Sequence, residues 1–223
     1  MYGHEHATHE RLDHGPPRRR GPRGRHRPGH RGRGRPRRRG GRPAADSATA
    51  RTSGTAGLKG VDYAAWQRDV QAVVDQATPY VTERTADARG RKQAIVLDID
   101  NSSLETDFHW TTFPTPAIKP VLELTRYAHS RGVAVFFVTA RPGILDSVTD
   151  WNLRQVGYPV SGLYVRHLPD LFQGVSTYKT AKRAEIEAKG YTIIANIGNN
   201  STDLVGGHAE RTFKLPDYDG KLS

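Results

Sequence analysis

The stretch AIVLDIDNSSLETDF, residues 94–108, decides the fold class. Its first four residues form an apolar run, which is typical of a strand buried on both faces of a parallel sheet. The run ends in Asp98 and Asp100, and a polar Asn-Ser-Ser sequence follows. Carboxylates at the end of a buried strand lose favourable hydration, so their presence there indicates that they have a chemical use.

The segments around this strand alternate between helix and strand patterns. Apolar side chains recur at helical spacing over residues 61–88, with a break expected near Pro79. Further helices are predicted over 115–132, 142–157 (with Pro142 in the first turn) and 176–190, and further strands over 133–141, 162–166, 191–200 and 211–216. Strands that alternate with helices predict βαβ units, a mostly parallel sheet and a three-layer α/β fold.

The basic charge is confined to one end of the chain. The 223 residues carry a formal net charge of +11, and residues 1–43, which contain 14 Arg, no Lys and three acidic residues, account for all of it. The remaining residues are electrically balanced and numerous enough to bury a sizeable core. We therefore expect residues 1–57 to be a disordered Arg/Gly/Pro-rich arm and linker, followed by one domain over 58–223.

Two interpretations of the arm stay open. An RNA-binding tail is one, although the aromatic side chains that would stack on bases are nearly absent, since the arm holds only Tyr2. The other is a misassigned start, because translated GC-rich DNA yields this composition. Of the two we favour the misassigned start, so nucleic acid is not expected as a partner, and any such binding would be through the arm only.

Composition excludes several other classes of protein. The chain has no Cys, which rules out disulfides, thiolate metal sites and a catalytic thiol. No apolar run approaches the roughly 20 residues of a membrane span, so no membrane partner is expected. The N-terminus as given has no apolar signal-peptide core, which favours a cytoplasmic protein unless the start is misassigned.

Polar side chains follow several of the predicted strands. Ligands bind at the carboxyl ends of such strands, and Asp98, Asp100, the Thr-Ala-Arg sequence at 139–141 and the Gly-Asn-Asn-Ser-Thr-Asp sequence at 198–203 all lie at those ends. Residues i and i+2 of an extended chain face the same way, so both carboxylates are expected to face one cleft. They would then hold a cation such as Mg²⁺, or one would take up a proton and serve as a general acid.

Four motifs in order resemble those of the haloacid-dehalogenase-like (HAD) phosphohydrolases. These are VLDIDNSSL, VFFVTAR, YKTAKR and IGNNSTDL. More narrowly, LDIDNSSLETDF, FFVTARP and GNNSTDL resemble acid phosphatases of the class B and plant vegetative-storage-protein type. The resemblance covers about residues 61–223 and implies a Rossmann-like HAD fold with a small cap or none. It also implies an exported protein that acts on small phosphomonoesters.

The resemblance implies a role for each matching residue. Asp98 would be the nucleophile that forms an aspartyl-phosphate, and Asp100 the general acid and base. Thr139, with Ala140 beside it, and Lys179 would bind the phosphoryl group, although Lys182 and Arg183 compete with Lys179 for that role. Mg²⁺ would be held by Asp98, Asp100, Asn199 and Asp203; Asp203 has an alternative role as a cap of the following helix.

One position departs from the family pattern. The family commonly has Asp where this chain has Asn199, which predicts weaker Mg²⁺ binding and leaves open a catalytically weak or inactive phosphate-binding or storage-type protein. Phe108 and Trp110 follow the first motif, where family members place residues over the site, so substrate contact is expected of both. The short connection from Asp98 to the next helix predicts an open site under a small loop lid.

Overall fold

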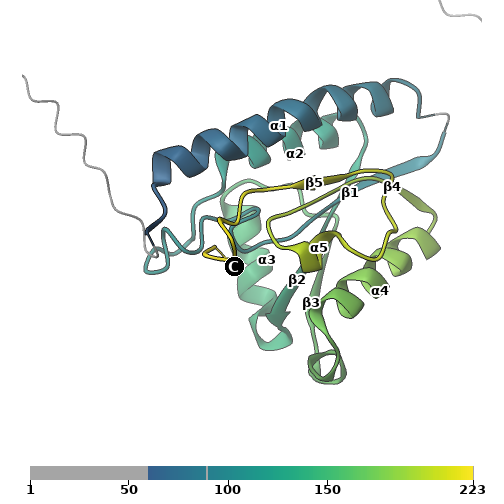
Figure 1. The fold of residues 1–223 in the computed structure, drawn as a ribbon. Helices are drawn as coiled ribbons and strands as arrows, with labels where there is room; N and C mark the ends of the chain where they lie inside the picture. The colour runs from purple at the N-terminus through teal and green to yellow at the C-terminus, as the bar shows by residue number, and fades with distance from the viewer. Residues whose placement is uncertain (1–59, 89, 223) are drawn as a thin grey trace, which may run out of the picture. The chain divides into compact units, whose positions relative to one another are not determined.

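The computed structural model describes residues 60–88 and 90–222. A five-stranded sheet lies at the centre (Figure 1), and its strands pair in parallel in the order β3-β2-β1-β4-β5. The strands are β1 (Lys92–Leu97), β2 (Ala134–Pro142), β3 (Gly162–Arg166), β4 (Tyr191–Gly198) and β5 (Thr212–Lys214). The chain therefore has the predicted parallel α/β fold, and the carboxyl ends of all five strands meet at one edge.

Helices cover both faces of this sheet. The α-helices are α1 (Tyr63–Ala86), α2 (Lys119–Ser130), α3 (Asp146–Gln155), α4 (Val175–Ala188) and α5 (Ser201–Leu204). Leu153 of α3 packs in the same core cluster as residues of α1 and α2, whereas Tyr178 and Ile186 of α4 pack in a second cluster on the other face. These are the three layers that the sequence pattern predicts.

The central strand supplies both cores by simple alternation. Ile95 and Leu97 belong to the larger cluster under α1 and α2, while Ala94 and Val96 face α4. A strand that must be apolar on both faces explains the continuous run before the two aspartates. The strand ends with the last of these packed residues, Leu97, and Asp98 is the next residue in the chain.

Two features involving proline differ from the sequence prediction, and other elements end or begin up to four residues from their predicted bounds, as α2 does by starting at Lys119 and not at residue 115. Helix α1 continues through Pro79 without the expected break, because Pro79 lies on the exposed face, where solvent can satisfy the carbonyl that loses its N–H partner. The helix expected from residue 142 begins only at Asp146. Pro142 instead extends β2, where it pairs with Arg166, and a 3₁₀ turn, η2 (Gly143–Leu145), intervenes.

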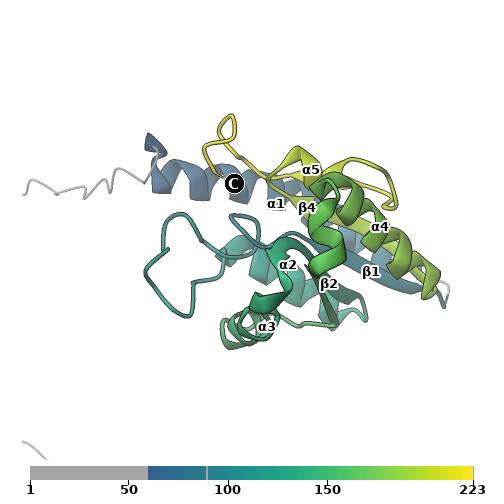
Figure 2. The same cartoon turned by 90° about the horizontal axis from the view of Figure 1, so that it is seen from below.

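Residues 98–118 connect β1 to α2 as a loop beyond the carboxyl ends of the strands (Figure 2), so the fold has no separate cap domain here. Within 60–88 and 90–222, no helix is long and apolar enough to cross a membrane. The predictions for residues 1–57, a disordered basic arm and linker that would be the one place for nucleic acid to bind, lie outside the described residues.

Candidate active site

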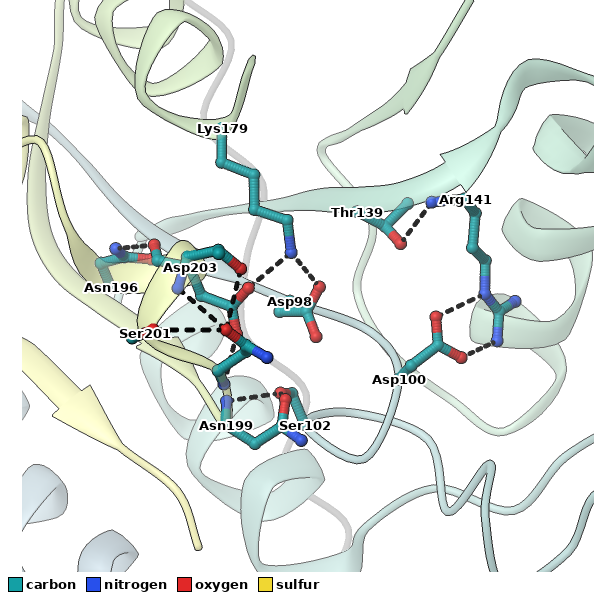
Figure 3. Close-up of polar contacts among 12 residues, drawn as sticks. Asp98, Asp100, Ser102, Thr139, Arg141, Lys179, Asn196, Asn199, Ser201 and Asp203 are labelled. Carbon is teal, nitrogen blue, oxygen red and sulfur yellow. Dashed lines mark hydrogen bonds and ion pairs between the residues drawn. The ribbon is translucent and has the colours of Figure 1, made fainter. Parts of the chain in front are cut away.

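A pocket of about 460 Å³ opens at the carboxyl ends of β1, β2 and β4. Six of the seven site residues predicted from sequence line it: Asp98, Asp100, Ala140, Lys179, Asn199 and Asp203. The other lining residues are Arg141, Val175, Asn200 and Thr202. Residues from four separate elements thus converge on one cavity, as Figure 3 shows for most of them.

A buried ion cluster lies on one side of this pocket. Lys179 donates from Nζ to Asp98 Oδ1 at 2.5 Å and to Asp203 Oδ1 at 2.6 Å, and all three side chains are buried. Two carboxylates thus share one ammonium. Burial raises the pKa of Asp98 to about 6 despite the opposing charge of Lys179, while the two carboxylates outweigh burial and raise the pKa of Lys179. With two carboxylates and one ammonium, the cluster has one more acidic than basic group.

Asp203 is fixed by its local sequence. Its Oδ2 accepts the N–H of Asn200 at 2.8 Å, which completes the capping box that begins α5. Gly198 makes this approach possible, because a Cβ at that position would lie 2.5 Å from the Asp203 carboxylate. Asp203 therefore takes part in capping α5, as one of the two predictions has it, and its side chain also lines the pocket.

The neighbouring basic residues of α4 point elsewhere. Lys182 pairs with Glu185 at 3.2 Å near the surface. Arg183 is buried, but its guanidinium donates to the backbone carbonyls of Asp203, Val205 and Gly207. Of the three candidates, Lys179 is the one that reaches Asp98.

A second ion pair holds Asp100 on the other side of the pocket. Arg141 donates from Nε to Oδ2 at 3.0 Å and from a terminal nitrogen to Oδ1 at 2.7 Å, and Thr106 Oγ1 donates to Oδ1 at 2.8 Å. Burial alone would raise the pKa of Asp100, but the hydrogen bonds and charge of Arg141 outweigh it and lower that pKa. Asp98 and Asp100 therefore stand in opposite electrostatic environments.

Thr139 is set back from the cavity. It is fully buried, and its Oγ1 accepts the backbone N–H of Arg141 at 3.2 Å. Ala140, which follows it, lines the pocket with its small side chain and leaves room beside Asp98. The residue of β2 that makes the most polar contacts at the site is thus Arg141, to which the sequence patterns assigned no role.

Asn199 is held by partners outside the pocket. Ser102 Oγ donates to its Oδ1 at 2.9 Å and accepts its backbone N–H at 2.9 Å, while its Nδ2 donates to the carbonyl of Leu222 at 3.0 Å. Lys214 also donates to the Asn199 carbonyl. An Asp at this position would lose the bond to Leu222, which explains in physical terms why the chain tolerates an amide there.

The donors around Asp98 suit a hard cation. Asp98, Asp203, the Asn199 amide and the nearby backbone carbonyls offer oxygen only, which is what Mg²⁺ prefers. In the described part of the chain, no group of three or more His, Cys, Asp or Glu side chains forms a metal site. A cation would therefore depend on carbonyl and amide oxygens as well, and the unbalanced negative charge of the Asp98–Lys179–Asp203 cluster would favour it.

The loop that follows Asp100 contradicts one prediction from the sequence. Phe108 does not face the pocket: its ring stacks on Trp66 of α1, with centroids 4.5 Å apart. Trp110 is largely exposed and does not line the pocket. The prediction that Phe108 contacts substrate is wrong, because burying the ring against Trp66 removes more apolar surface from water than exposure in an open pocket would.

A family model described as "HAD superfamily, subfamily IIIB (Acid phosphatase)" matches residues 45–112 and 113–221. The chain belongs to this family. Among its relatives, the Glycine max stem 28 kDa glycoprotein is 35% identical over 109 residues, which are 46% of this chain and 42% of that protein. Acid phosphatase 1 of Solanum lycopersicum is 33% identical over 104 residues, 46% of this chain and 41% of the relative.

The fold matches that of a solved acid phosphatase. The class C acid phosphatase of Bacillus anthracis superposes with a TM-score of 0.58 at 17% identity, covering 70% of this chain and 79% of that one. The family and fold predicted from the four motifs are thus confirmed. The matches to the two plant proteins span less than half of each relative's length, so the activity of this HAD-family chain is a matter for proposal.

Proposed function

We propose that this HAD-family chain is a Mg²⁺-dependent phosphomonoester hydrolase of the acid phosphatase type. The observation that carries the proposal is the Asp98 carboxylate at an open pocket, held by Lys179 on one side and adjacent to an Arg141-bound Asp100 on the other. A nucleophile, a proton-transfer group and a cation beside the phosphoryl position are the parts that this chemistry needs. Family membership supports the same reading.

The reaction would proceed in two displacements. Asp98 attacks phosphorus, so that an Asp98 O–P bond forms while the P–O bond to the alcohol breaks, and the alcohol oxygen takes a proton from Asp100. Asp100, now ionised, removes a proton from water as that water attacks phosphorus and releases phosphate and free Asp98. Lys179 offsets the charge on the phosphoryl oxygens in both steps.

The contacts of Asp100 require one local movement. The Arg141 pair lowers the pKa of Asp100 and so favours its ionised form, which acts as a general base. For Asp100 to donate a proton first, Arg141 has to turn from it toward the bound phosphoryl group, which a cationic residue that lines the pocket is placed to do. Ala140 would then border the phosphoryl oxygens from the end of β2, while Thr139, which is set back from the cavity, would position the backbone N–H of Arg141.

Mg²⁺ would be held by Asp98, the Asp100 carbonyl, Asn199 and Asp203, and it would neutralise charge on the phosphoryl group. The open pocket, over which residues 98–118 form a loop and not a domain, suits small phosphomonoesters of varied structure. For location, we propose export, as the family resemblance implies; N-terminal sequencing of the native protein would test it, since an exported form should begin at a processing site and not at Met1.

The test of the proposed function is phosphate release from p-nitrophenyl phosphate. We expect turnover with millimolar Mg²⁺ and loss of at least about 100-fold with excess EDTA, restored by added Mg²⁺, because the cation supplies several kcal/mol of charge stabilisation. A protein that is folded by circular dichroism yet releases no phosphate across pH 4–8 would overturn the proposal. That outcome would favour the phosphate-binding or storage-type alternative.

The phosphate-binding or storage-type alternative is motivated by Asn199, the amide at a position where the family commonly has Asp. Substitution of Asn199 by Asp tests the part that this residue plays in cation binding. In Asn199→Asp, the new carboxylate meets the Leu222 carbonyl and adds negative charge to the site, so without Mg²⁺ we expect a loss of about 1–3 kcal/mol in unfolding free energy. Mg²⁺ should raise the melting temperature of this variant more than that of the parent, because the added charge strengthens cation binding. Thermal unfolding in EDTA and in Mg²⁺ measures both effects.

Asn200→Asp is the matched control. Asn200 lines the same pocket, but its Oδ1 only accepts hydrogen bonds, from Thr202, and Asp caps a helix equally well. We expect no comparable loss of stability from the same change of charge there. Equal behaviour of the two variants would contradict the assigned place of Asn199 in the cation site.

A further inference from the structure

An apolar groove of about 550 Å³ lies where β2 and β3 end. It is next to the pocket lined by Asp98 and Asp100, which is called the phosphate pocket below. Pro142 and Arg166 pair across these two strands, so the turns that follow them, η2 and the 3₁₀ helix η3 (Leu168–Phe172), leave the sheet side by side. The apolar lining comes from both turns: Pro142, Gly143, Ile144, Leu168, Pro169 and Leu171.

The walls of this groove are held by specific contacts. The Arg166 guanidinium donates to the carbonyls of Asp170 at 2.9 Å and Gln173 at 2.6 Å, and a capping box joins His167 to Asp170. Gly143 packs so closely that a Cβ there would lie 2.4 Å from the His167 ring. Arg166 and His167 also line the groove, but the Arg166 guanidinium is engaged by the carbonyls of η3 and of Gln173, and the other lining side chains are hydrocarbon.

This hydrocarbon is exposed to a degree unusual for such residues. Ile144 is 91% and Leu168 is 74% exposed, although both side chains are large and aliphatic. Groups of exposed apolar side chains in soluble proteins commonly mark a binding surface. Few polar side chains line the groove, so a sugar or other hydroxyl-rich group would find few hydrogen-bond partners in it, whereas an alkyl chain needs none.

The groove continues directly from the site. Ala140 and Arg141 line the phosphate pocket, and the next residues in the chain, Pro142 to Ile144, line the groove. Arg141 holds Asp100, the residue that would protonate the leaving oxygen, so the leaving alcohol has to lie on the Asp100 side of Asp98, toward the end of β2 (Figure 3). A leaving group that extends from the phosphate in that direction reaches the groove.

We infer that the groove binds the leaving group of the substrate, and that the chain prefers phosphomonoesters of aliphatic alcohols. This inference rests on the proposed function, since it assigns the leaving group a place relative to Asp100. A buried methylene contributes about 0.8 kcal/mol, which is close to a fourfold change per carbon, and partial burial in an open groove would give about twofold. Affinity should thus grow with chain length.

The experiment is a chain-length series. We expect kcat/KM with Mg²⁺ to rise about twofold to fourfold per methylene from ethyl through butyl and hexyl to octyl phosphate, each kept below its micelle concentration. Ile144→Ser combined with Leu168→Ser should flatten this slope. The slope compares several substrates on the same variant. A lower fraction of folded protein reduces every rate by the same factor and leaves the slope unchanged. Val205→Ser, at an exposed apolar residue beside α5, should keep the parental slope.

The possible results distinguish a failure of this inference from a failure of the phosphatase proposal on which it rests. If the parent hydrolyses ethyl phosphate with a flat chain-length profile, the groove does not take the leaving group, while the phosphatase proposal stands. If p-nitrophenyl phosphate is hydrolysed but none of the alkyl esters is, the inference fails and the phosphatase proposal stands. If p-nitrophenyl phosphate is not hydrolysed either, the phosphatase proposal fails, and the alkyl esters are then compared as ligands by thermal shift. A shift that does not grow with chain length overturns the inference; growth that is lost in the Ile144/Leu168 variant supports it.

Discussion

Replacement of Asp98 by Asn is expected to lower phosphate release by about 10⁴-fold or more, because it removes the atom that would bond to phosphorus. Asn has nearly the same shape, and it can still accept the 2.5 Å contact from Lys179 through its Oδ1. A loss of activity would then reflect chemistry and not a collapsed pocket. The measurement is single-turnover phosphate release with p-nitrophenyl phosphate at saturating Mg²⁺.

The same variant should be more stable than the parent when Mg²⁺ is removed. Burial raises the pKa of Asp98 from 3.8 to about 6, so between these values the folded state binds a proton that the unfolded chain does not. The contribution of Asp98 to stability therefore falls as pH rises from about 4 to 6, and the full cost is present above pH 6. Asn removes that cost, with an expected gain of about 1–3 kcal/mol at pH 7 in EDTA.

Urea unfolding at pH 4.5 and pH 7 tests this directly. The gain from Asp98→Asn should be largest at pH 7 and should shrink at pH 4.5, where the parental carboxyl is protonated. Asp150→Asn is the control, because Asp150 makes a surface pair with Arg154 and the same substitution there should change neither activity nor the pH trend. A destabilised Asp98→Asn at pH 7 in EDTA would show that Lys179 fully compensates the Asp98 charge.

The sequence predicted the fold well because its signal is local. The apolar run over 94–97, the other buried strands and the alternating helices each follow from periodicity, and parallel topology brings their ends together. Six of the seven proposed site residues line one pocket for the same reason, since each lies directly at a strand end or near the start of the next helix.

What the sequence could not show depends on long-range contacts. Arg141 is the last residue of the second motif, but its contact with Asp100, 41 residues away, has no local pattern in the sequence. Ser102 reaches Asn199 across 97 residues. Phe108 could have faced the pocket or the core, and only the position of Trp66 on α1 decides that it faces the core. Propensity also misplaced Pro142, because pairing with Arg166 outweighed its preference for a helix start.

Replacement of Lys179 by Met should have the largest effect on stability. Lys179 is 4% exposed and is the ammonium shared by Asp98 and Asp203, so Met leaves two buried carboxylates facing each other without a counter-charge. Breaking a buried ion pair in this way costs about 3–5 kcal/mol, and phosphate release should also fall about 10²- to 10³-fold because a charge on the phosphoryl group is lost. Urea unfolding at pH 7 in EDTA measures the loss of stability.

Two further results are expected of Lys179→Met if the loss of stability comes from unpaired buried charge. Without Lys179 the buried Asp98 carboxyl loses the charge that opposes its raised pKa and takes a proton more readily in the folded state, so lowering the pH from 7 to 5 should recover part of the lost stability. Adding Asp203→Asn to Lys179→Met should recover part of it at pH 7 as well, because one buried charge then remains in place of two. Lys182→Met, one turn further along α4 and paired with Glu185 near the surface, should cost less than about 1 kcal/mol. If Lys179→Met were as stable as Lys182→Met, the buried cluster would not exist in solution, and the nucleophile would have to be held in some other way.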